Sequence, residues 1–337
     1  MKFILSFKIL ISESLKNGSA SYKAPSDVLS IAKANGYQEY PIKVDYRYGK
    51  IYRLLNSLYQ LIKFSYKIPA GSIVIYQYPE IHPFLMLLGL SLSRRWYRIT
   101  VIHDINSIRN TGHMALFEVK LLKEHDVLIV HTTSMQNYLV NKKNISSPRY
   151  FSLDAFPYLA KIDRRNRNNS CSICFPGNID KSLFIPLLLK ENPNVQIELY
   201  GNKVKTEIAM YDNAHYHGIF SPDDVCGLLG SWGLVWDGDS IDSCSGNLGV
   251  YHSIIAPHKF SLFLVAGLPL IVWKNSAMAE MVKNKKLGLC LDNLRNLREV
   301  LSSIDESEYQ EYRANILQYA DMVISKGENL QDILGNI

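Results

Sequence analysis

The chain has 337 residues, of which 20% are charged and 47% are hydrophobic, the proportions of an ordinary soluble globular protein. This length exceeds what one hydrophobic core usually organises, so two domains are expected. The net charge of +6 suits anionic small ligands or an anionic membrane surface, and it is too small to indicate nucleic acid binding. Five cysteines without a regular spacing indicate a reducing compartment.

The first apolar run, residues 3–11, resembles the core of a signal peptide only superficially. Lys8 interrupts it and no convincing small-residue cleavage site follows, which favours a first buried strand. No apolar run reaches the roughly 18 to 20 residues that a membrane span requires, and the longest candidate, residues 84–92, is far shorter. The sequence therefore predicts a cytoplasmic protein.

The first half alternates expected strands with expected helices. Strands are predicted at 3–11, 72–78, 99–102 and 126–130, and helices begin near residues 24, 46, 83 and 134. This alternation is typical of a doubly wound α/β sheet. The polar loop 14–23 after the first strand is either a ligand-facing edge of that sheet or a plain surface turn.

Two features of the first half have both a functional and a structural interpretation. His103 and Asp104 follow a predicted strand, where they suit acid–base chemistry, or Asp104 caps the next segment while His103 packs. The apolar residues 83–93 precede a basic and aromatic run, residues 94–98. That arrangement fits either contact with an anionic bilayer or a core helix with a solvated basic end.

The composition shifts between residues 154 and 169, where residues 164–169 are polar, basic and without periodicity, as in a linker. A second α/β series then follows, with strands predicted at 172–175 and 195–200. These strands end in the glycine-bearing segments 176–178 and 201–203. Residues 221–224 (SPDD) form a good helix start, with proline at the first helical position.

Residues 233–273 form the stretch around which the second half is organised. They indicate a strand, a polar glycine-rich loop, a helix that starts near Phe260 and stops at Gly267, and another strand. The N-terminus of such a helix offers free N–H groups and partial positive charge to a phosphate, and Lys259 adds a full charge. The pattern predicts a pocket for a nucleotide diphosphate.

Two metal-like motifs are better explained otherwise. Cys171 and Cys174 lack a second pair at zinc spacing and fit inside a strand. Asp237 and Asp239 imitate a metal-binding Asp-x-Asp, but they lie deep in the second half of the chain. A role in loop shaping or in binding sugar hydroxyls is the favoured interpretation.

At these residues the chain resembles a bacterial glycosyltransferase group. The segments that carry the resemblance are 236–240 (WDGDS), 244–246 (CSG), Gly249, Tyr251, 257–259 (PHK) and 267–269 (GLP), with weaker similarity at Gly18, Lys23, Ala24, Asp27, 103–105, Arg109, Gly177 and Asn178. The group includes the β-1,6-galactofuranosyltransferases of O-antigen assembly and the glucosyltransferases that extend N-acetylglucosamine on serine-rich adhesins. The resemblance covers essentially the whole chain.

The resemblance implies a GT-B fold, in which two Rossmann-like α/β domains face a cleft. Residues 1–160 would form an acceptor-binding domain and residues 170–320 a nucleotide-sugar-binding domain, while a C-terminal helix in 321–337 would pack back on the first domain. Members act without a metal, so no cofactor is expected and the UDP-sugar is a substrate. The resemblance leaves the formation of a homo-oligomer open.

The resemblance and the strand-end positions together nominate site residues. Catalytic roles are expected for Lys259, which would stabilise the departing diphosphate, and for Asp104 as general base with His103 in reserve. The expected nucleotide-sugar-binding residues are Gly177, Asn178, Tyr200, Gly201, Asp237, Asp239, Ser245, Gly246, Tyr251, His258, Lys259 and Ser261. The expected acceptor-binding residues are Asn17, Gly18, Ser19, Lys23 and Arg109.

The chain departs from the group around the expected donor sugar. Val250 replaces an acidic residue, Ile255 replaces an asparagine, and residues 247–248 replace a small residue and an aromatic one. Leu262 lies near the place of the glutamate that related GT-B enzymes carry. The family therefore does not fix the transferred sugar, and ribose recognition must come from elsewhere.

The predicted activity is transfer of a hexose, galactofuranose or glucose or galactose, from a UDP-sugar to a saccharide with inversion to a β product. The acceptor would be a saccharide, lipid-linked or glycoprotein substrate in the assembly of surface polysaccharide, such as O-antigen or capsule, or of glycoprotein. Peripheral contact with the inner face of the membrane stays open, and no nucleic acid partner is expected. The alternatives are a retaining hexosyltransferase, a sugar-nucleotide epimerase and a non-enzymatic saccharide-binding module.

Overall fold

The computed structural model describes the chain except for residues 11–21, 46, 80–95, 110–114 and 203–206. The chain divides into two compact units. The N-terminal unit comprises Met1–Asn17, Ala24–Leu153 and Leu330–Ile337, and the C-terminal unit comprises Gly18–Lys23 and Asp154–Asn329. The main change of unit at residues 153–154 comes shortly before the polar stretch in which the sequence places a linker.

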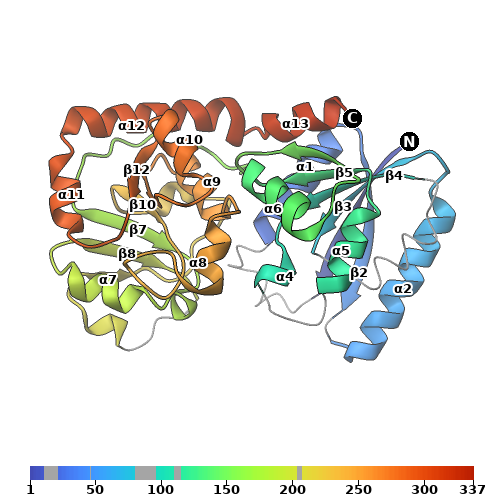
Figure 1. The fold of residues 1–337 in the computed structure, drawn as a ribbon, viewed down its shortest axis with the longest axis horizontal. Helices are drawn as coiled ribbons and strands as arrows, with labels where there is room; N and C mark the ends of the chain where they lie inside the picture. Colours follow the sequence, from blue (N-terminus) through green and yellow to red (C-terminus); the bar gives the residue numbers. More distant parts are fainter. Residues whose placement is uncertain (11–21, 46, 80–95, 110–114, 203–206) are drawn as a thin grey trace. The chain divides into compact units, whose positions relative to one another are not determined.

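The N-terminal unit is built on a six-stranded parallel sheet with the strand order β2-β1-β3-β4-β5-β6. Its strands are β1 (Lys2–Leu10), β2 (Gln38–Asp45), β3 (Ile73–Tyr78), β4 (Tyr97–Ile102), β5 (Val127–Val130) and β6 (Arg149–Ser152). The helices are α1 (Lys23–Ala34), α2 (Lys50–Lys67), α4 (Asn106–Arg109), α5 (Ala115–Lys123) and α6 (Thr133–Lys143). The strands and helices alternate along the chain as the sequence predicts (Figure 1).

The C-terminal unit repeats this plan with a second six-stranded parallel sheet, in the order β12-β11-β10-β7-β8-β9. Its strands are β7 (Ser172–Pro176), β8 (Gln196–Tyr200), β9 (Ala214–Tyr216), β10 (Trp232–Val235), β11 (Leu270–Trp273) and β12 (Gly288–Leu291). The helices are α7 (Ile185–Glu191), α8 (Gly246–His252), α9 (His258–Val265), α10 (Ala279–Asn284), α11 (Leu297–Ser303) and α12 (Glu306–Tyr319). α12 continues through the short π-helix η6 (Ala320–Ile324), and the last helix is α13 (Glu328–Gly335).

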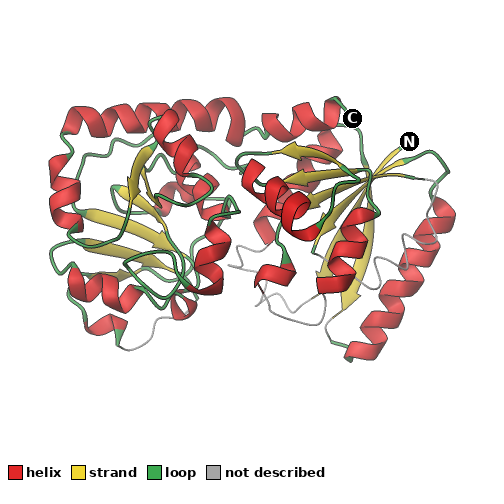
Figure 2. Ribbon diagram, in the orientation of Figure 1, coloured by secondary structure: helices red, strands yellow, loops and turns green. Residues whose placement is uncertain are grey.

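Successive residues of the C-terminal strands point into two different cores. Ile173 and Phe175 of β7 lie in a core with α7 and α11, whereas Cys174 between them lies in a core with α9 and α10. Because side chains alternate across a strand, a sheet that is covered by helices on both faces needs apolar residues at every position. Figure 2 shows helices on both faces of this sheet.

Gly233 in β10 lets α9 pack closely on the sheet. A Cβ atom at this position would lie 2.4 Å from Cγ of Phe263, a fully buried residue of α9. α9 then ends at Gly267, which has a φ of +64° that disfavours other residues. The predicted helix, with its stop at Gly267, is therefore confirmed and starts two residues earlier than expected, at His258.

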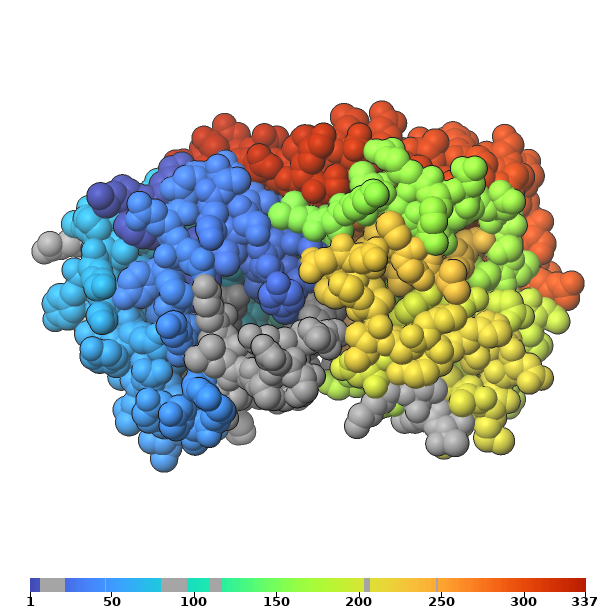
Figure 3. Space-filling model, turned by 180° about the vertical axis from the view of Figure 1, so that it is seen from behind, coloured from blue at the N-terminus to red at the C-terminus, as the bar shows by residue number. Residues whose placement is uncertain are grey.

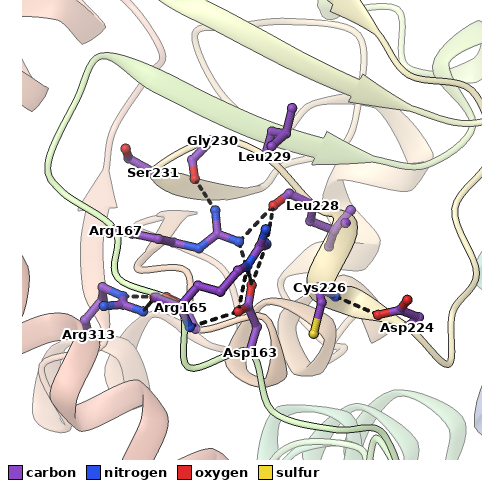
Figure 4. A network of polar contacts seen from close by, with 12 residues as sticks. Asp163, Arg165, Arg167, Asp224, Cys226, Leu228, Leu229, Gly230, Ser231 and Arg313 are labelled. Carbon is purple, nitrogen blue, oxygen red and sulfur yellow. Dashed lines mark hydrogen bonds and ion pairs between the residues drawn. The ribbon is translucent and has the colours of Figure 1, made fainter.

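The stretch expected to be a linker is fastened to the C-terminal unit. Asp163, buried and central in this segment, accepts hydrogen bonds from the guanidinium groups of Arg165 and Arg167, at 2.7 to 3.1 Å. Arg167 also donates to the backbone oxygens of Leu228 and Gly230 (Figure 4). We call residues 163–167 the strap. It lies along α12, as the green and red surfaces of Figure 3 show, where Arg313 donates to the backbone oxygen of Arg165.

One expected helix is not formed. The segment 221–224 leads only into the short 3-10 turn η5 (Val225–Gly227), which the Asp224 side chain caps by accepting from the N–H of Cys226. The backbone oxygen of Leu228, the residue after η5, accepts a hydrogen bond from Arg167 of the strap and not from a following helical N–H. The apolar helix expected at 83–93 lies outside the described residues. Within the part of the chain that the structure describes, no helix is long and apolar enough to cross a membrane.

Candidate functional site

The strand order places a topological switch point between β7 and β10. From β7 the chain proceeds to β8 and β9 on one side, and β10, β11 and β12 follow on the other side. In open parallel sheets, the loops that leave the carboxyl ends of two such strands diverge and leave room for a ligand. The corresponding point of the N-terminal sheet lies between β1 and β3.

Lys259 of α9 lies at the switch point of the C-terminal sheet. Its Nζ atom donates to the backbone oxygen of Trp236, just beyond β10, at 3.2 Å. The same Nζ lies 4.4 Å from the centre of the Phe175 ring in β7, and 4.0 Å from where a Cβ atom would stand on Gly177. The ammonium group therefore lies between the carboxyl ends of β7 and β10, the two strands that flank the switch point.

The carboxylate of Asp237 is the counterion of Lys259. Its Oδ2 lies 3.5 Å from Nζ of Lys259 and 3.1 Å from Nε2 of the buried His252 in α8. Burial works against the charge of this carboxylate, but the Lys259 ammonium and the hydrogen bond with His252 outweigh it, so the pKa of Asp237 lies well below its ordinary value. Asp237 is therefore ionised at neutral pH, and it holds the lysine in place.

Backbone groups line the same edge because two glycines approach each other closely. A Cβ atom on Gly201, after β8, would lie 2.2 Å from the backbone oxygen of Gly177, after β7. Only glycine at position 201 allows this approach. The side chain of the next residue, Asn178, accepts from the N–H of Lys181 and caps the short turn η3 (Ile179–Lys181).

The loop between β10 and α8 is shaped by Asp239. Its carboxylate accepts a short hydrogen bond from the Ser245 hydroxyl, and a Cβ atom on Gly246 would stand 3.4 Å from the same carboxylate. Gly238 has a φ of +115°, and a Cβ atom there would lie 2.5 Å from the backbone oxygen of Ser245. Tyr251 is buried in α8, which this loop leads into.

Of the remaining nominated residues of this unit, Tyr200 and Ser261 are buried and His258 is partly exposed. His258, the first residue of α9, lies against the Tyr158 ring with centroids 4.9 Å apart. The Tyr200 hydroxyl accepts from the N–H of Leu229 at 2.8 Å, so this side chain is held inside the unit. Ser261 is buried in α9, and its hydroxyl has no hydrogen-bond partner among the described residues.

In the N-terminal unit, His103 and Asp104 follow β4, as the sequence predicts. Nε2 of His103 lies 2.8 Å from Oε1 of Gln77 in β3, and Asp104 is partly exposed in the loop before α4. The buried Glu118 of α5 fixes this loop by accepting from the N–H groups of Asn106 and Ser107, at 2.8 and 3.0 Å. The loop that carries Asp104 is thus anchored to α5.

Three of the expected acceptor-binding residues, Asn17, Gly18 and Ser19, lie outside the described residues. Lys23 is buried within the C-terminal unit, where it forms an ion pair with Asp223 at 2.8 Å and donates to the backbone oxygen of Leu159. Arg109 is the last residue of α4.

Three residues that shape these sites were not nominated from the sequence. Phe175 supports Lys259 through its ring, His252 holds Asp237, and Glu118 anchors the loop after β4. Phe175 and His252 look like ordinary core residues in the sequence, and Glu118 belongs to the next helix, with no motif that links it to the loop. Among the described residues, no group of three or more His, Cys, Asp or Glu side chains is placed to hold a metal ion.

Comparison with known families agrees with this architecture. The family "Glucosyltransferase 3-like, N-terminal domain" matches residues 8–149, and "Glucosyltransferase 3-like, C-terminal domain" matches residues 173–337. The chain belongs to the glucosyltransferase 3-like family. The resemblance to bacterial glycosyltransferases is thereby confirmed.

The chain is similar to enzymes of this family along nearly its whole length. It is 26% identical over 328 residues to the β-1,6-galactofuranosyltransferase WbbI of Escherichia coli K12, which covers 94% of each chain. It is 20% identical over 317 residues to glucosyltransferase 3 of Streptococcus gordonii, which covers 90% of this chain and 89% of that one. The family member is accordingly a glycosyltransferase.

Solved structures confirm the GT-B fold. Anabaena HepE, in complex with UDP and glucose, superposes with a TM-score of 0.64 at 11% identity and covers 100% of this chain and 99% of its own. WaaG, a glycosyltransferase involved in lipopolysaccharide biosynthesis, gives a TM-score of 0.59 at 9% identity and covers 99% of each chain. The two parallel sheets of this family member are the two Rossmann-like domains of that fold.

Proposed function

We propose that the protein transfers a hexose from a UDP-sugar to a saccharide hydroxyl, with inversion at the anomeric carbon. The position of Lys259 at the switch point between β7 and β10 carries this proposal. A cation fixed there, beside the N-terminus of α9, suits a diphosphate. The diphosphate is the leaving group, and it gains negative charge as its bond to the sugar breaks.

Lys259 would act mainly in the transition state. As the bond between the sugar and the β-phosphate breaks, negative charge grows on the diphosphate, and a cation that is already in place stabilises it without reorganisation. Its hydrogen bond to Trp236 and its ion pair with Asp237 hold the lysine in place before the donor arrives. The N–H groups of Gly177 and Gly201 already donate to the backbone oxygens of Tyr200 and Gly218, so a further backbone donor to the nucleotide would come from the neighbouring Asn178.

We propose that transfer needs no metal ion. The two carboxylates that imitate a metal site are both engaged within the unit, Asp237 by Lys259 and His252 and Asp239 by Ser245. Lys259 would supply the positive charge on the diphosphate. Turnover that stops in the presence of EDTA and returns with a divalent cation would contradict this part of the proposal.

Asp104 is the proposed general base. The acceptor hydroxyl attacks the anomeric carbon, its proton passes to the Asp104 carboxylate, and the bond to the diphosphate breaks on the opposite face of the sugar. Asp104 suits this role because it is partly exposed at the carboxyl edge of the N-terminal sheet, in a loop anchored through Glu118. His103, held by Gln77, is the reserve candidate.

The names of the relatives limit the choice of donor and acceptor. WbbI is a galactofuranosyltransferase and the streptococcal relatives are glucosyltransferases, so UDP-galactofuranose and UDP-glucose are the first donors to test, followed by UDP-galactose. We propose a lipid-linked saccharide or a glycoprotein glycan as acceptor, in the assembly of bacterial surface polysaccharide or glycoprotein, by an enzyme that acts in the cytoplasm.

A screen of these three UDP-sugars, read out as UDP release with and without saccharide acceptors, tests the proposal. One donor is expected to be consumed faster when an acceptor is present, and the product anomer should be β. An α product would identify a retaining enzyme, and acceptor-independent conversion of the donor sugar would identify an epimerase. Failure of UDP itself to bind would leave only a saccharide-binding module.

The variant Asp104→Asn tests the assignment of the base separately. Removing the proton acceptor should lower turnover by about 10²- to 10⁴-fold, the range of general base catalysis, with unchanged UDP affinity. The variant His103→Gln is the matched control, because it keeps a hydrogen-bonding group beside Gln77. Normal turnover of Asp104→Asn together with a large loss for His103→Gln would transfer the role to His103.

A further inference from the structure

The outward side of α2 carries an unusual number of exposed apolar side chains. Exposed large apolar residues of α2 include Ile51, Tyr52, Leu54, Leu55, Tyr59 and Tyr66, with exposed fractions of up to 87% for Tyr66. Soluble proteins scatter such residues singly over their surface, whereas contiguous apolar patches mark sites of interaction.

Four of these six side chains lie along one side of the helix. Tyr52, Leu55, Tyr59 and Tyr66 are spaced by three, four and seven residues, which places them on one side of a helix, and Lys63 fills the gap in the series. We call these five residues the outer face of α2. The opposite side is anchored: Ser57, Leu61 and Phe64 are buried against the unit.

The anchoring explains why the outer face of α2 cannot turn inward. α2 lies beside β2, the edge strand of the N-terminal sheet (Figure 1). The Gln60 side chain accepts from the N–H of Lys43 in β2 and donates to the oxygen of the same residue, both at 2.9 Å. The helix thus covers the free edge of the sheet with its polar and buried side, and its outer face stays in solvent.

The charge on α2 favours one kind of partner. α2 has no acidic residue, and Lys50, Lys63 and Lys67 are exposed along it. A second copy of the chain placed face to face on this helix would oppose like charges, which disfavours a symmetric dimer through it. Tyrosines and aliphatic residues beside lysines are instead the composition of helices that lie in the interface of an anionic bilayer.

We propose that the outer face of α2 docks on the surface of an anionic lipid bilayer. The Leu55 side chain and the tyrosine rings of this face would enter the boundary between head groups and acyl chains, while Lys63 and the neighbouring Lys67 contact lipid phosphates. The proposal does not depend on which sugar is transferred or whether UDP binds.

Sedimentation with lipid vesicles tests the proposal. The full chain should bind vesicles made of equal parts of phosphatidylglycerol and phosphatidylcholine, and bind pure phosphatidylcholine vesicles more weakly. Binding should weaken as salt rises from about 0.1 M to about 1 M, because the Debye length shortens from about 10 Å to about 3 Å. Equal binding to both kinds of vesicle at all salt concentrations would contradict the role of the lysines.

Two sets of substitutions locate the surface. The apolar variant Leu55→Ser, Tyr59→Ser, Tyr66→Ser and the charge variant Lys63→Glu, Lys67→Glu should each weaken binding to the anionic vesicles about tenfold or more. The matched control Leu187→Ser, Lys190→Glu changes the same residue types on the exposed side of α7 and should bind as the wild type does. Thermal unfolding and UDP binding of each variant establish that it is folded.

Three results would overturn the proposal. The first is failure of the wild type to bind anionic vesicles, and the second is wild-type binding by both α2 variants. The third is a concentration-dependent dimer, seen by light scattering, that both α2 variants abolish while vesicle binding is absent. That last result would assign the face to a contact between two copies of the chain.

Discussion

Gly233 shows how a single residue sets the position of the proposed phosphate-binding helix. A Cβ atom there would lie 2.4 Å from Cγ of Phe263, so a larger residue would push α9 away from β10. Lys259 is one turn from Phe263 on the same helix, and it reaches the backbone of Trp236 only because α9 lies this close. The glycine thus affects the site without facing the ligand.

Gly233→Ala is expected to lower the free energy of unfolding by about 1 to 3 kcal/mol, the cost of overpacking a core. The control is Gly227→Ala, where a Cβ atom would meet nothing within 4 Å. That variant should stay within about 0.5 kcal/mol of the wild type. Chemical denaturation measures both, and equal stability of the two variants would show that α9 can move away at no cost.

At the residue scale, the sequence identifies chemistry more readily than contacts. Lys259 could be nominated because a lysine at the start of a helix, after a glycine-rich loop, has a known affinity for phosphate. Its two supports could not be nominated. Phe175 and His252 are separated from it by 84 and 7 residues in the numbering, and both could equally be packing residues.

The strap explains how α9 is held at its other end. The N–H of Asp163 donates to the oxygen of Val265 at 2.8 Å, and a Cβ atom on Gly267 would lie 2.7 Å from the oxygen of Asp163. Asp163 is in turn fixed by Arg165 and Arg167 (Figure 4). Gly267 therefore lets the strap cross the end of α9, because it has no side chain to collide with the backbone of Asp163 and can adopt a positive φ.

Asp163→Asn should be strongly destabilising, by about 3 to 5 kcal/mol, because it leaves the largely buried guanidinium group of Arg167 without its counterion. The matched control is Asp321→Asn, which removes an exposed carboxylate that pairs with Arg164 at 3.0 Å. That change should cost less than about 1 kcal/mol. Thermal and chemical unfolding compare the two, and a small effect of Asp163→Asn would contradict the structural role of the strap.

The strap was predicted only as a linker, and the reason is physical. Residues 164–169 are polar, basic and aperiodic, which is also the composition of a free connection between domains. What distinguishes a strap is a set of backbone oxygens that accept from its arginines, and these come from Leu228 and Gly230, far along the chain. Every residue has a backbone oxygen, so the residue types in the sequence do not show which oxygens accept from the arginines.

On the scale of the whole molecule, the alternation of strands and helices was sufficient to predict two parallel α/β domains. Each buried strand lies between glycine or polar breaks, and the helices follow at regular distances. The strand order could not be read from this pattern. The switch point, on which the proposed site depends, results from the pairing of β7 with β10, strands that are separated by about 60 residues.

Stability of the whole chain should depend on pH through the buried His125 of the N-terminal unit. Burial lowers the pKa of its imidazole to about 3, with the Arg98 charge acting in the same direction and the hydrogen bond to the Leu121 oxygen opposing it. The unfolded chain, with a histidine pKa of about 6.5, therefore binds more protons between pH 3 and 6.5. Stability from this group is complete above about pH 6.5 and is lost as the pH falls.

The predicted slope is up to about 1.4 kcal/mol per pH unit between pH 6 and 4. The variant His125→Leu should lose this part of the slope, because it has no imidazole at this position to protonate on unfolding. Chemical denaturation at several pH values measures the slopes. Identical slopes in the wild type and His125→Leu would show that His125 is not protonated on unfolding.

The most direct test of the central claim is the affinity of UDP for the wild type and for Lys259→Ala, measured by titration calorimetry. Loss of a charged hydrogen bond to the diphosphate should weaken binding about 10- to 100-fold. Lys283→Ala, which removes an exposed lysine of α10, should bind UDP as the wild type does. Undiminished UDP binding by Lys259→Ala would contradict the placement of the diphosphate at the switch point.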